Sequence, residues 1–511
     1  MSDDHWDIVG YWKQLEILRP RVSQRAYDFF SKHFDVLLTY LIYRFGWIVC
    51  ALSAAKGMDI TMKVMLIQPP SSSKHMDTIF MHEPLALEYL GAGLRLDNHE
   101  VVIFDARLES DYEEALRSYK PQVVGLTAFT NQLSIVKEMA SRIKAINPRI
   151  FTIVGGHHAT VKPEDFNVKD IDLVVRGEGV TALSEILQCI EANKPFDSIL
   201  GLGIPGSETY LTPSRTHPNL DNLPIPDRTL TIKYRKNYFE EWMKPLTSIR
   251  TSLGCVNRCT YCALWALTDG KYLVRKPESI IEELQSIEEP NVFFCDDESM
   301  CDSQRMDKLA DLIRESGIKK KYYLYARVDT ILKHPNLFAK WKNIGLAQVF
   351  IGFESYTNKK LNDLKKNITI EQQYKAAKIL NDLKIGIAGS FMVDPSYTRE
   401  DFDGLISHIR SLKVDVVICS ILTPLPGTEL YESKKAELIT DKPEAYDFLH
   451  TVLPTKLPLK QFYSEFSRLY MKATPLLTSL KYIQKYEKGC KLRTGLDFMK
   501  TIKIIKNNYR S

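Results

Sequence analysis

The stretch Gly254-Cys255-Val256-Asn257-Arg258-Cys259-Thr260-Tyr261-Cys262 places three cysteines within eight positions. Three and two residues separate them, which fits one tight loop. Three thiolates can bind three irons of a 4Fe-4S cluster, which ordinarily takes four cysteines, so the fourth iron would be left for a non-protein ligand. A zinc site would need a fourth cysteine or a histidine nearby, and none follows within the loop. Chance clustering or a zinc loop is the alternative to a cluster site.

Strand-like and helix-like patterns alternate on both sides of the cysteines. The candidate strands are Thr247–Thr251, Asn291–Cys295, Tyr322–Ala326, Gln348–Gly352, Gly386–Val393 and Asp415–Ile421. Six strand–helix units exceed a minimal open sheet and fall short of the eight units of a complete barrel. The pattern therefore predicts a six-unit partial barrel over residues 246–435, whose first strand leads directly into the cysteines.

A first series of apolar runs precedes this region. The runs are Lys63–Ile67, Val101–Phe104, Val123–Leu126, Phe151–Val154 and Asp172–Val175. Five such runs alternating with amphipathic stretches predict a doubly wound parallel sheet over residues 61–200. Ligands of such sheets bind at the carboxyl ends of the strands. The predicted order is then a helical extension (1–60), this α/β domain, a proline-rich linker (201–245), the partial barrel and a helical C-terminal region (436–511).

The composition fits a globular protein. The chain has 511 residues, of which 44% are hydrophobic and 26% charged, so disordered and collagen-like classes are excluded. Nine cysteines are too few, and odd in number, for a disulfide scaffold. The formal charge of +5 is small for this length and gives no indication of nucleic-acid binding.

Two terminal segments bear on membrane contact. The apolar stretch Phe34–Ala55 carries Arg44 in its middle, whereas a spanning helix needs about 20 nearly uncharged residues. A helix packed on the protein and a helix lying on a membrane surface both stay open for it. The tail from Lys472 to Ser511 holds ten basic and two acidic residues interleaved with apolar ones. It predicts either a solvated basic helix or contact with anionic lipid headgroups.

The cysteine stretch resembles the signature of the radical SAM superfamily. In that family the open iron binds the amino and carboxylate groups of S-adenosylmethionine, and reductive cleavage yields a 5′-deoxyadenosyl radical that abstracts hydrogen. The resemblance implies that Cys255, Cys259 and Cys262 bind the cluster and that Tyr261 packs near the adenine. Further contacts are implied at later strand ends: Asp296, Asp297 and Glu298 for the amino group, Arg327 for the carboxylate, Glu354 for the ribose, and Gly389 and Ser390 for the adenine.

The succession of the two α/β regions resembles the cobalamin-binding radical SAM proteins. The implied cobalamin contacts are Thr127, Gly155, Gly156, His157, Thr160, Gly177, Glu178 and Gly179. One departure matters, because Asp-x-His-x-x-Gly is missing after the first strand, where the loop reads Gln68-Pro-Pro-Ser-Ser-Ser-Lys-His75. We therefore expect no histidine on cobalt, with His157 and His158 as tail or structural contacts. A domain that binds nothing is the alternative.

Several segments look closest to the hopanoid C-3 methylases within this family. They are His82–Glu88, Cys262–Trp265, Glu289–Glu298 and Asp447–Leu459. The resemblance implies a methyltransferase that passes a methyl group from S-adenosylmethionine through methylcobalamin to an unactivated carbon of a hopanoid-like lipid. No general base is required at such a carbon, so no catalytic side chain is predicted. A non-methylating enzyme, such as a cyclase or a ring-forming enzyme acting on a lipid or tetrapyrrole, and a sensor without turnover are the alternatives.

The same resemblance implies the partners. A lipid or other hydrophobic small molecule would be the substrate, and a flavodoxin or ferredoxin would supply the electron. No nucleic acid is expected. We expect a cytoplasmic protein, and peripheral contact with the inner face of the membrane stays open.

Overall fold

The computed structural model describes residues 61–71, 77, 80–240, 242–473 and 502–508. The predicted N-terminal extension, including Phe34–Ala55, and most of the predicted basic tail lie outside these residues. Among the helices of the described residues, none is long and apolar enough to cross a membrane.

The first sheet contains seven strands. They are β1 (Lys63–Gln68), β3 (Glu100–Asp105), β4 (Val123–Thr127), β5 (Phe151–Gly155), β6 (Leu173–Val175), β7 (Leu202–Ile204) and β8 (Tyr210–Leu211), in the order β3-β1-β4-β5-β6-β7-β8. The strands from β3 to β6 pair in parallel, and β7 and β8 extend the sheet in antiparallel pairing. The five parallel strands are the five apolar runs of the sequence.

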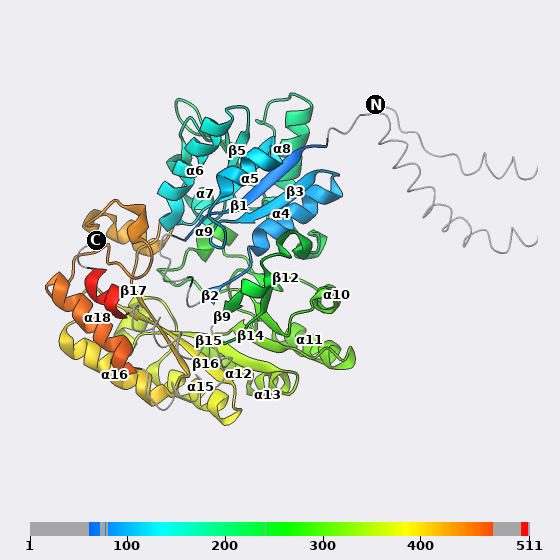
Figure 1. Ribbon diagram of the computed structural model, residues 1–511. Coiled ribbons are helices and arrows are strands. Elements are labelled where there is room, and N and C mark those ends of the chain that lie inside the picture. Colours follow the sequence, from blue (N-terminus) through cyan, green and yellow to red (C-terminus); the bar gives the residue numbers. More distant parts are fainter. Residues whose placement is uncertain (1–60, 72–76, 78–79, 241, 474–501, 509–511) are drawn as a thin grey trace, which may run out of the picture. The chain divides into compact units, whose positions relative to one another are not determined.

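Helices cover both faces of this sheet (Figure 1). On one face, α4 (Leu85–Leu96) and α8 (Val180–Glu191) share a buried core with strand residues such as Val64 and Ile153. On the other face, α5 (Tyr112–Tyr119) and α6 (Leu133–Ile146) pack on a second core. Two cores on opposite faces make the sheet doubly wound, as predicted.

The second sheet has six strands, all in parallel pairing. They are β10 (Leu246–Ile249), β13 (Asn291–Phe294), β14 (Lys321–Tyr325), β15 (Leu346–Glu354), β16 (Gly386–Val393) and β17 (Val416–Ile421), in sequence order across the sheet. Helices α10 (Pro277–Ser286), α11 (Ser303–Glu315), α13 (Pro335–Asn343), α15 (Ile370–Asp382) and α16 (Arg399–Leu412) lie along its outside (Figure 1). This is the predicted six-unit partial barrel.

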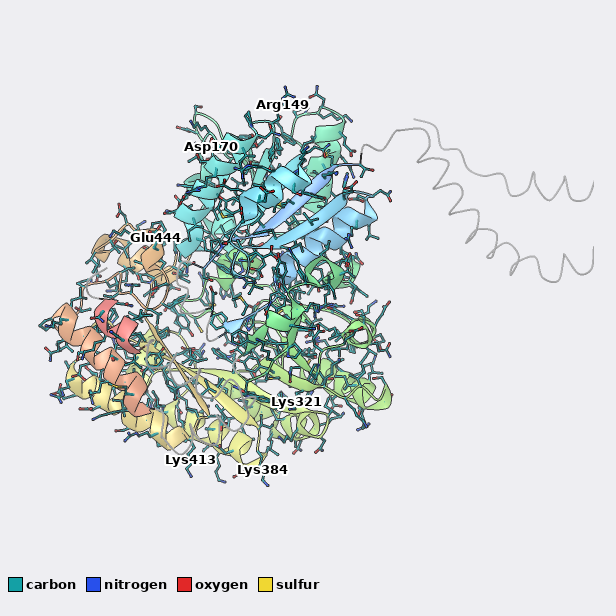
Figure 2. All side chains as sticks on the ribbon, in the orientation of Figure 1. Arg149, Asp170, Lys321, Lys384, Lys413 and Glu444 are labelled. Carbon is teal, nitrogen blue, oxygen red and sulfur yellow. The ribbon has the colours of Figure 1, made fainter. Side chains whose placement is uncertain are left out.

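Alternation along these strands separates two apolar layers. Residues such as Phe294, Ile351 and Phe391 belong to the large core beneath the helices. Residues on the inner side, such as Phe293 and Tyr323, form a smaller aromatic cluster. Lys384 and Lys413, just before the amino ends of β16 and β17, lie at one margin of the protein (Figure 2). The cysteine loop follows the carboxyl end of β10.

Two segments differ from their predicted character. The predicted linker contains β7, β8, β9 (Phe239–Glu240) and three short 3₁₀ helices, and β9 pairs with β2 (Phe80–Met81). Strands of two or three residues are too short to show alternation, which is why the sequence pattern missed them. In the C-terminal region, α18 (Leu459–Ala473) packs on α16, but residues 438–458 are irregular apart from one 3₁₀ turn, although they were predicted to be helical.

Candidate cofactor site

The cysteines lie in a loop that a short β-ribbon closes at its base. β11 (Ser252–Leu253) pairs antiparallel with β12 (Leu273–Val274). Gly254 has φ +93°, and a Cβ there would lie 1.9 Å from the carbonyl oxygen of Lys271, so only glycine fits where the loop begins. Burial raises the pKa of the Cys255 thiol, and burial with the neighbouring thiols raises that of Cys262 to about 12. Among the described residues, no three His, Cys, Asp or Glu side chains lie close enough to hold a single metal ion.

Asp296 and Asp297, predicted to meet the amino group of S-adenosylmethionine, hold the start of this loop. The Asp296 carboxylate accepts hydrogen bonds from the backbone N–H of Thr251 (2.7 Å) and Ser252 (2.8 Å) and from the Thr251 hydroxyl (2.5 Å). Asp297 accepts from the Gly254 N–H at 2.7 Å. The two carboxylates therefore hold the backbone at the start of the loop in place.

Glu298 and Arg327 lie beside the cysteines. Oε1 of Glu298 accepts from the Arg327 N–H at 3.4 Å, and its buried Oε2 receives no hydrogen bond from the described residues. Burial raises the pKa of Glu298 to about 7. The Arg327 guanidinium donates to Asp329 and to the Lys366 carbonyl, both at 2.9 Å. The Glu298 carboxyl, which has one oxygen without a hydrogen bond, therefore lies next to the Arg327 guanidinium, whose position two hydrogen bonds fix.

Tyr261, Glu354 and Lys366 form a hydrogen-bonded triad, in which Glu354 and Lys366 are buried and Tyr261 is partly buried. The Tyr261 hydroxyl donates to Glu354 Oε1 at 2.9 Å, and the Lys366 ammonium donates to the same oxygen at 2.8 Å. Glu354 has φ +65° and follows a register shift in the pairing of β15 with β16. Lys366 is a site residue that the sequence reasoning missed, because nothing links it to the cysteines along the chain.

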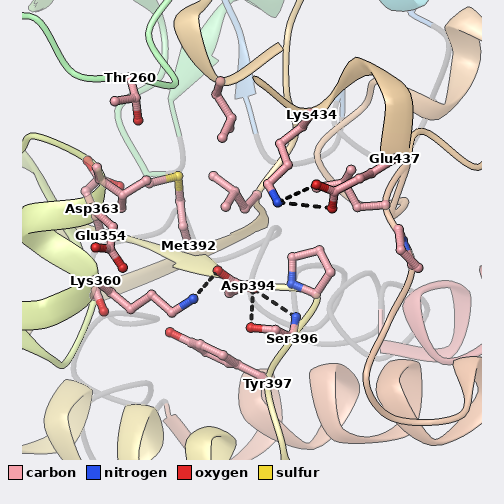
Figure 3. A pocket seen from close by; sticks show the side chains of 17 residues that line it. Thr260, Glu354, Lys360, Asp363, Met392, Asp394, Ser396, Tyr397, Lys434 and Glu437 are labelled. Atoms are coloured by element: carbon pink, nitrogen blue, oxygen red, sulfur yellow. Dashed lines mark hydrogen bonds and ion pairs between the residues drawn. The ribbon is translucent and has the colours of Figure 1, made fainter. Parts of the chain in front are cut away.

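A pocket of about 380 Å³ opens beside this triad, at the carboxyl ends of β15 to β17 (Figure 3). Thr260 and Glu354 line it on one side, and Met392 and Leu422 supply apolar surface. Lys360 forms an ion pair with Asp394 at 2.6 Å in its wall. Of the two predicted adenine contacts, Ser390 is on the inner side of β16, as Ala388 is. Gly389 faces the helices, where a Cβ would meet Phe391, Val414 and Phe353 at 3.0–3.2 Å.

The predicted cobalamin residues come together at the carboxyl edge of the first sheet. Gly156 has φ +101°, and a Cβ there would lie 2.7 Å from Thr127 Oγ1 and 2.8 Å from the Ala128 nitrogen. The Thr160 hydroxyl donates to the Gly156 carbonyl at 2.9 Å and accepts from the Gly177 N–H at 3.0 Å. Gly155 is the last residue of β5, and the Gly156 backbone passes close to Thr127 and Ala128 at the end of β4.

Glu178 and Gly179 serve the start of a helix in this arrangement. Gly179 is the N-cap residue of α8, and the Glu178 carboxylate accepts from the N–H groups of Val180 and Thr181. This satisfies donors that a helix start leaves free.

The two adjacent histidines have different environments. His158 is buried, with Nδ1 3.1 Å from the Thr130 hydroxyl and Nε2 2.9 Å from Asp165, so it is a structural residue. His157 is exposed, and its ring lies edge-on to Phe129 with centroids 4.8 Å apart. Partial desolvation of the ring and the charge of Arg250 lower its pKa.

Comparison with known proteins assigns both regions. Residues 80–187 match the B12 binding domain family and residues 249–409 match the radical SAM superfamily. The chain is 31% identical to the hopanoid C-3 methylase of Methylococcus capsulatus, over 79% of this chain and 78% of that protein. The chain belongs to the cobalamin-binding radical SAM family. The anaerobic magnesium-protoporphyrin IX monomethyl ester cyclase of Rubrivivax gelatinosus is 24% identical to this chain, over 84% of this chain and 81% of its own length.

Solved structures of cobalamin-binding radical SAM proteins share the fold. The enzyme OxsB, with aqua-cobalamin and S-adenosylmethionine bound, superposes with a TM-score of 0.68 at 15% identity and covers 88% of this chain and 72% of its own. The methyltransferase TsrM from Kitasatospora setae, with cobalamin and a 4Fe-4S cluster bound, gives 0.60 at 17% identity and covers 75% and 76%. The cofactors of this family member are a 4Fe-4S cluster, S-adenosylmethionine and cobalamin.

The residues present fit these three groups. Thiols from one loop suit a cluster, and the buried Glu298 Oε2 suits an ammonium, because a buried acceptor without a donor is costly. Gly156 lets the ends of β4 and β5 approach closely, since any side chain there would clash with Thr127 and Ala128, and this approach shapes the edge at which cobalamin would bind.

Proposed function

We propose that this protein is a cobalamin-dependent radical SAM methyltransferase that adds a methyl group to an unactivated carbon of a hopanoid-like lipid. The observation that carries the proposal is the 31% identity to the hopanoid C-3 methylase over most of both chains. When bound, the cluster and S-adenosylmethionine supply a radical that removes hydrogen, and cobalamin carries the methyl group.

In this proposal Cys255, Cys259 and Cys262 hold the cluster. Asp296 and Asp297 keep the loop in shape through the Thr251, Ser252 and Gly254 backbone groups. This departs from our expectation that all three acidic residues meet the amino group of S-adenosylmethionine. That role is left to Glu298, whose Oε2 is free, while Arg327 faces the carboxylate.

The pocket beside Glu354 would take the adenosine. Its volume of about 380 Å³ can hold a nucleoside, and Glu354 offers the ribose an acceptor whose position Tyr261 and Lys366 fix. Met392 and Leu422 give the base an apolar surface that excludes water. Gly389 faces the helices, so it would affect the pocket only through its packing against Phe353 and Val414.

At the first sheet, Thr127, Gly155, Gly156, Thr160 and Gly177 would form the cobalamin edge. His157, neutral because its pKa is low, offers hydrogen bonding without adding charge. The Glu178 carboxylate and Gly179 would act through the start of α8.

The second candidate is a non-methylating radical enzyme such as a ring-forming cyclase. It is favoured by the 24% identity to the protoporphyrin ester cyclase, which spans most of both chains. Both candidates need an electron donor, for which flavodoxin or ferredoxin is the proposed class, and both leave peripheral membrane contact open as a route to a lipid.

An anaerobic assay separates the candidates. Reconstituted protein would be given cobalamin, S-adenosylmethionine, a strong reductant and a hopanoid-containing lipid extract, and 5′-deoxyadenosine and S-adenosylhomocysteine would be quantified together with lipid mass. We expect both nucleosides in about equal amounts and a lipid heavier by one methyl group. Substrate-dependent 5′-deoxyadenosine without S-adenosylhomocysteine would instead support the cyclase candidate.

A further inference from the structure

A buried ion network lies where the first sheet's domain meets the partial barrel, outside the chemistry proposed above. It comprises Glu83, Glu88, Arg228, Arg235, Arg275, Glu283 and Glu289. The side chains of Glu83, Glu88 and Glu283 are fully buried, and the three arginines are nearly so. Burying each of these charges costs free energy and buried ion pairs add little net stability, so stability alone does not account for the network.

The network covers the free edge of β10. β10 is the terminal strand of the second sheet, and an uncovered strand edge leaves backbone groups without partners. On the side away from β13, the Ser248 N–H donates to Glu83 Oε1 at 2.5 Å, and the Ser248 carbonyl accepts from Arg228 Nη2 at 2.7 Å. A carboxylate and a guanidinium thus take the places that a neighbouring strand would fill.

These groups come from both domains. Glu83 stands just before α4, which packs on the first sheet, whereas Ser248 belongs to the strand that leads into the cysteine loop. Arg235 bridges the two, because Nη1 donates to Glu83 Oε2 at 2.8 Å and Nη2 donates to Thr247 Oγ1 at 2.5 Å. Its Nε also donates to Glu289, just before β13. Arg228 reaches Glu283 of α10 at 2.7 Å.

The charges of the network balance if one carboxyl is neutral. Four carboxyl groups face three guanidinium groups. Burial and repulsion by Glu83 raise the pKa of Glu88 to about 8, and the Thr231 hydroxyl donates to its Oε1. Buried ion pairs of this kind add little net stability compared with apolar packing, but their hydrogen bonds are directional. The network is therefore better suited to fixing geometry than to raising stability.

We propose that the buried ion network is a positioning device that fixes the cysteine loop relative to the cobalamin edge, with Glu83 as its central positioning residue. Glu83 touches neither proposed cofactor site, and it acts through Ser248 and Arg235. Methyl transfer requires two cofactors at a set separation, and a misplacement of about 1 Å can cost roughly 10²-fold in rate. The inference rests on the proposed function, because it requires that the cluster and cobalamin both bind to this chain.

The test compares the holoenzyme with Glu83→Gln, which keeps the shape of the side chain and replaces its carboxyl group with an amide. Pulsed electron paramagnetic resonance would measure the distance between the cob(II)alamin spin and the reduced cluster spin. We expect one narrow distance distribution for the wild type and a distribution at least twice as broad for Glu83→Gln, at unchanged iron and cobalamin content. Glu113→Gln is the matched control, since Glu113 pairs with Arg117 and Arg142 within the first domain only.

A second measurement does not depend on the cofactors. Hydrogen exchange of peptides covering residues 246–253 reports directly on the Ser248 N–H, and we expect exchange at least tenfold faster in Glu83→Gln, with β14 peptides unchanged. If Glu83→Gln does not fold, Arg235→Lys serves as the second variant. It keeps the positive charge and loses the planar guanidinium group, and we expect the same changes in distance distribution and exchange rate, but smaller. Wild-type distances and exchange rates in both variants would overturn the inference. A wild-type protein that binds no cobalamin would refute the proposed function. Hydrogen exchange would still show whether Glu83 holds the edge of β10.

Discussion

The Lys366 ammonium lies 2.8 Å from Oε1 of Glu354, the same oxygen to which Tyr261 donates at 2.9 Å. Both charged side chains are nearly buried, with exposed fractions of 9% and 8%. Two donors on one oxygen fix the carboxylate and leave its second oxygen to the adjoining pocket. The aromatic residue between the last two cysteines is thereby tied to the end of β15, although 92 residues separate them along the chain.

Removing Lys366 should leave a buried carboxylate without its cation. We expect Lys366→Met to lower the free energy of unfolding by about 3 kcal/mol, as for other buried pairs that lose one partner. Adding Glu354→Gln should restore part of this loss, because the uncompensated charge is gone. Denaturant unfolding of both variants measures the difference. Lys378→Met, which disrupts the exposed pair with Asp382, is the control and should cost less than about 0.5 kcal/mol.

Cys259 should be essential for the cluster. Cys259→Ala removes the most buried of the three thiols of the loop, and we expect iron content, the visible absorbance of the cluster and 5′-deoxyadenosine formation to be lost together. Cys189→Ala lies in α8, away from the loop, and should leave all three at wild-type values. An unchanged iron content in Cys259→Ala would refute the assignment of the cluster to this loop.

Gly156 should be required for cobalamin binding but not for cluster binding. In Gly156→Ala the new Cβ would lie 2.7 Å from Thr127 Oγ1 and 2.9 Å from the Ala128 carbonyl oxygen, at a φ that disfavours side chains. We expect at least a tenfold weaker affinity for hydroxocobalamin in spectroscopic titration, with iron content unchanged. Gly206→Ala, where the nearest atom would be 3.3 Å away and φ is not positive, should bind cobalamin like the wild type. Equal affinities of the two variants would argue against this edge as the cobalamin site.

The fold could be predicted from the sequence because its elements are encoded locally. The parallel strands are continuous apolar runs such as Val123–Leu126, since both faces of each strand are buried under helices. The cysteine loop could be predicted because its three cysteines lie within eight residues. Gly156 could also be anticipated, because a glycine pair at a strand end indicates close approach of the backbone.

Features that depend on distant residues could not be predicted in this way. Lys366 and Glu83 look like ordinary charged residues, and only the tertiary structure brings them to Glu354 and Ser248. The contacts of Asp296 could not be predicted for a related reason, because a strand-end carboxylate can face a ligand or the backbone of its own loop. Its contacts with Thr251 and Ser252 become visible only once β10 and β13 are paired.

Glu88 should make stability depend on pH above neutrality. Its pKa is about 8 in the folded protein against 4.5 for an ordinary glutamate, chiefly because of burial and then because of Glu83. The folded state therefore holds a proton that the unfolded state releases, so stability from this group is complete below about pH 4.5 and falls as pH rises to about 8, by at most about 1.4 kcal/mol per pH unit. Glu88→Gln cannot ionise, so its stability relative to the wild type should be greater at pH 8.5 than at pH 6. Thermal unfolding of both proteins at the two pH values measures this, with the exposed Glu138→Gln as a control whose offset should not change with pH. An offset between Glu88→Gln and wild type that is the same at both pH values would show that Glu88 is ionised in the folded protein and that the network carries a net negative charge.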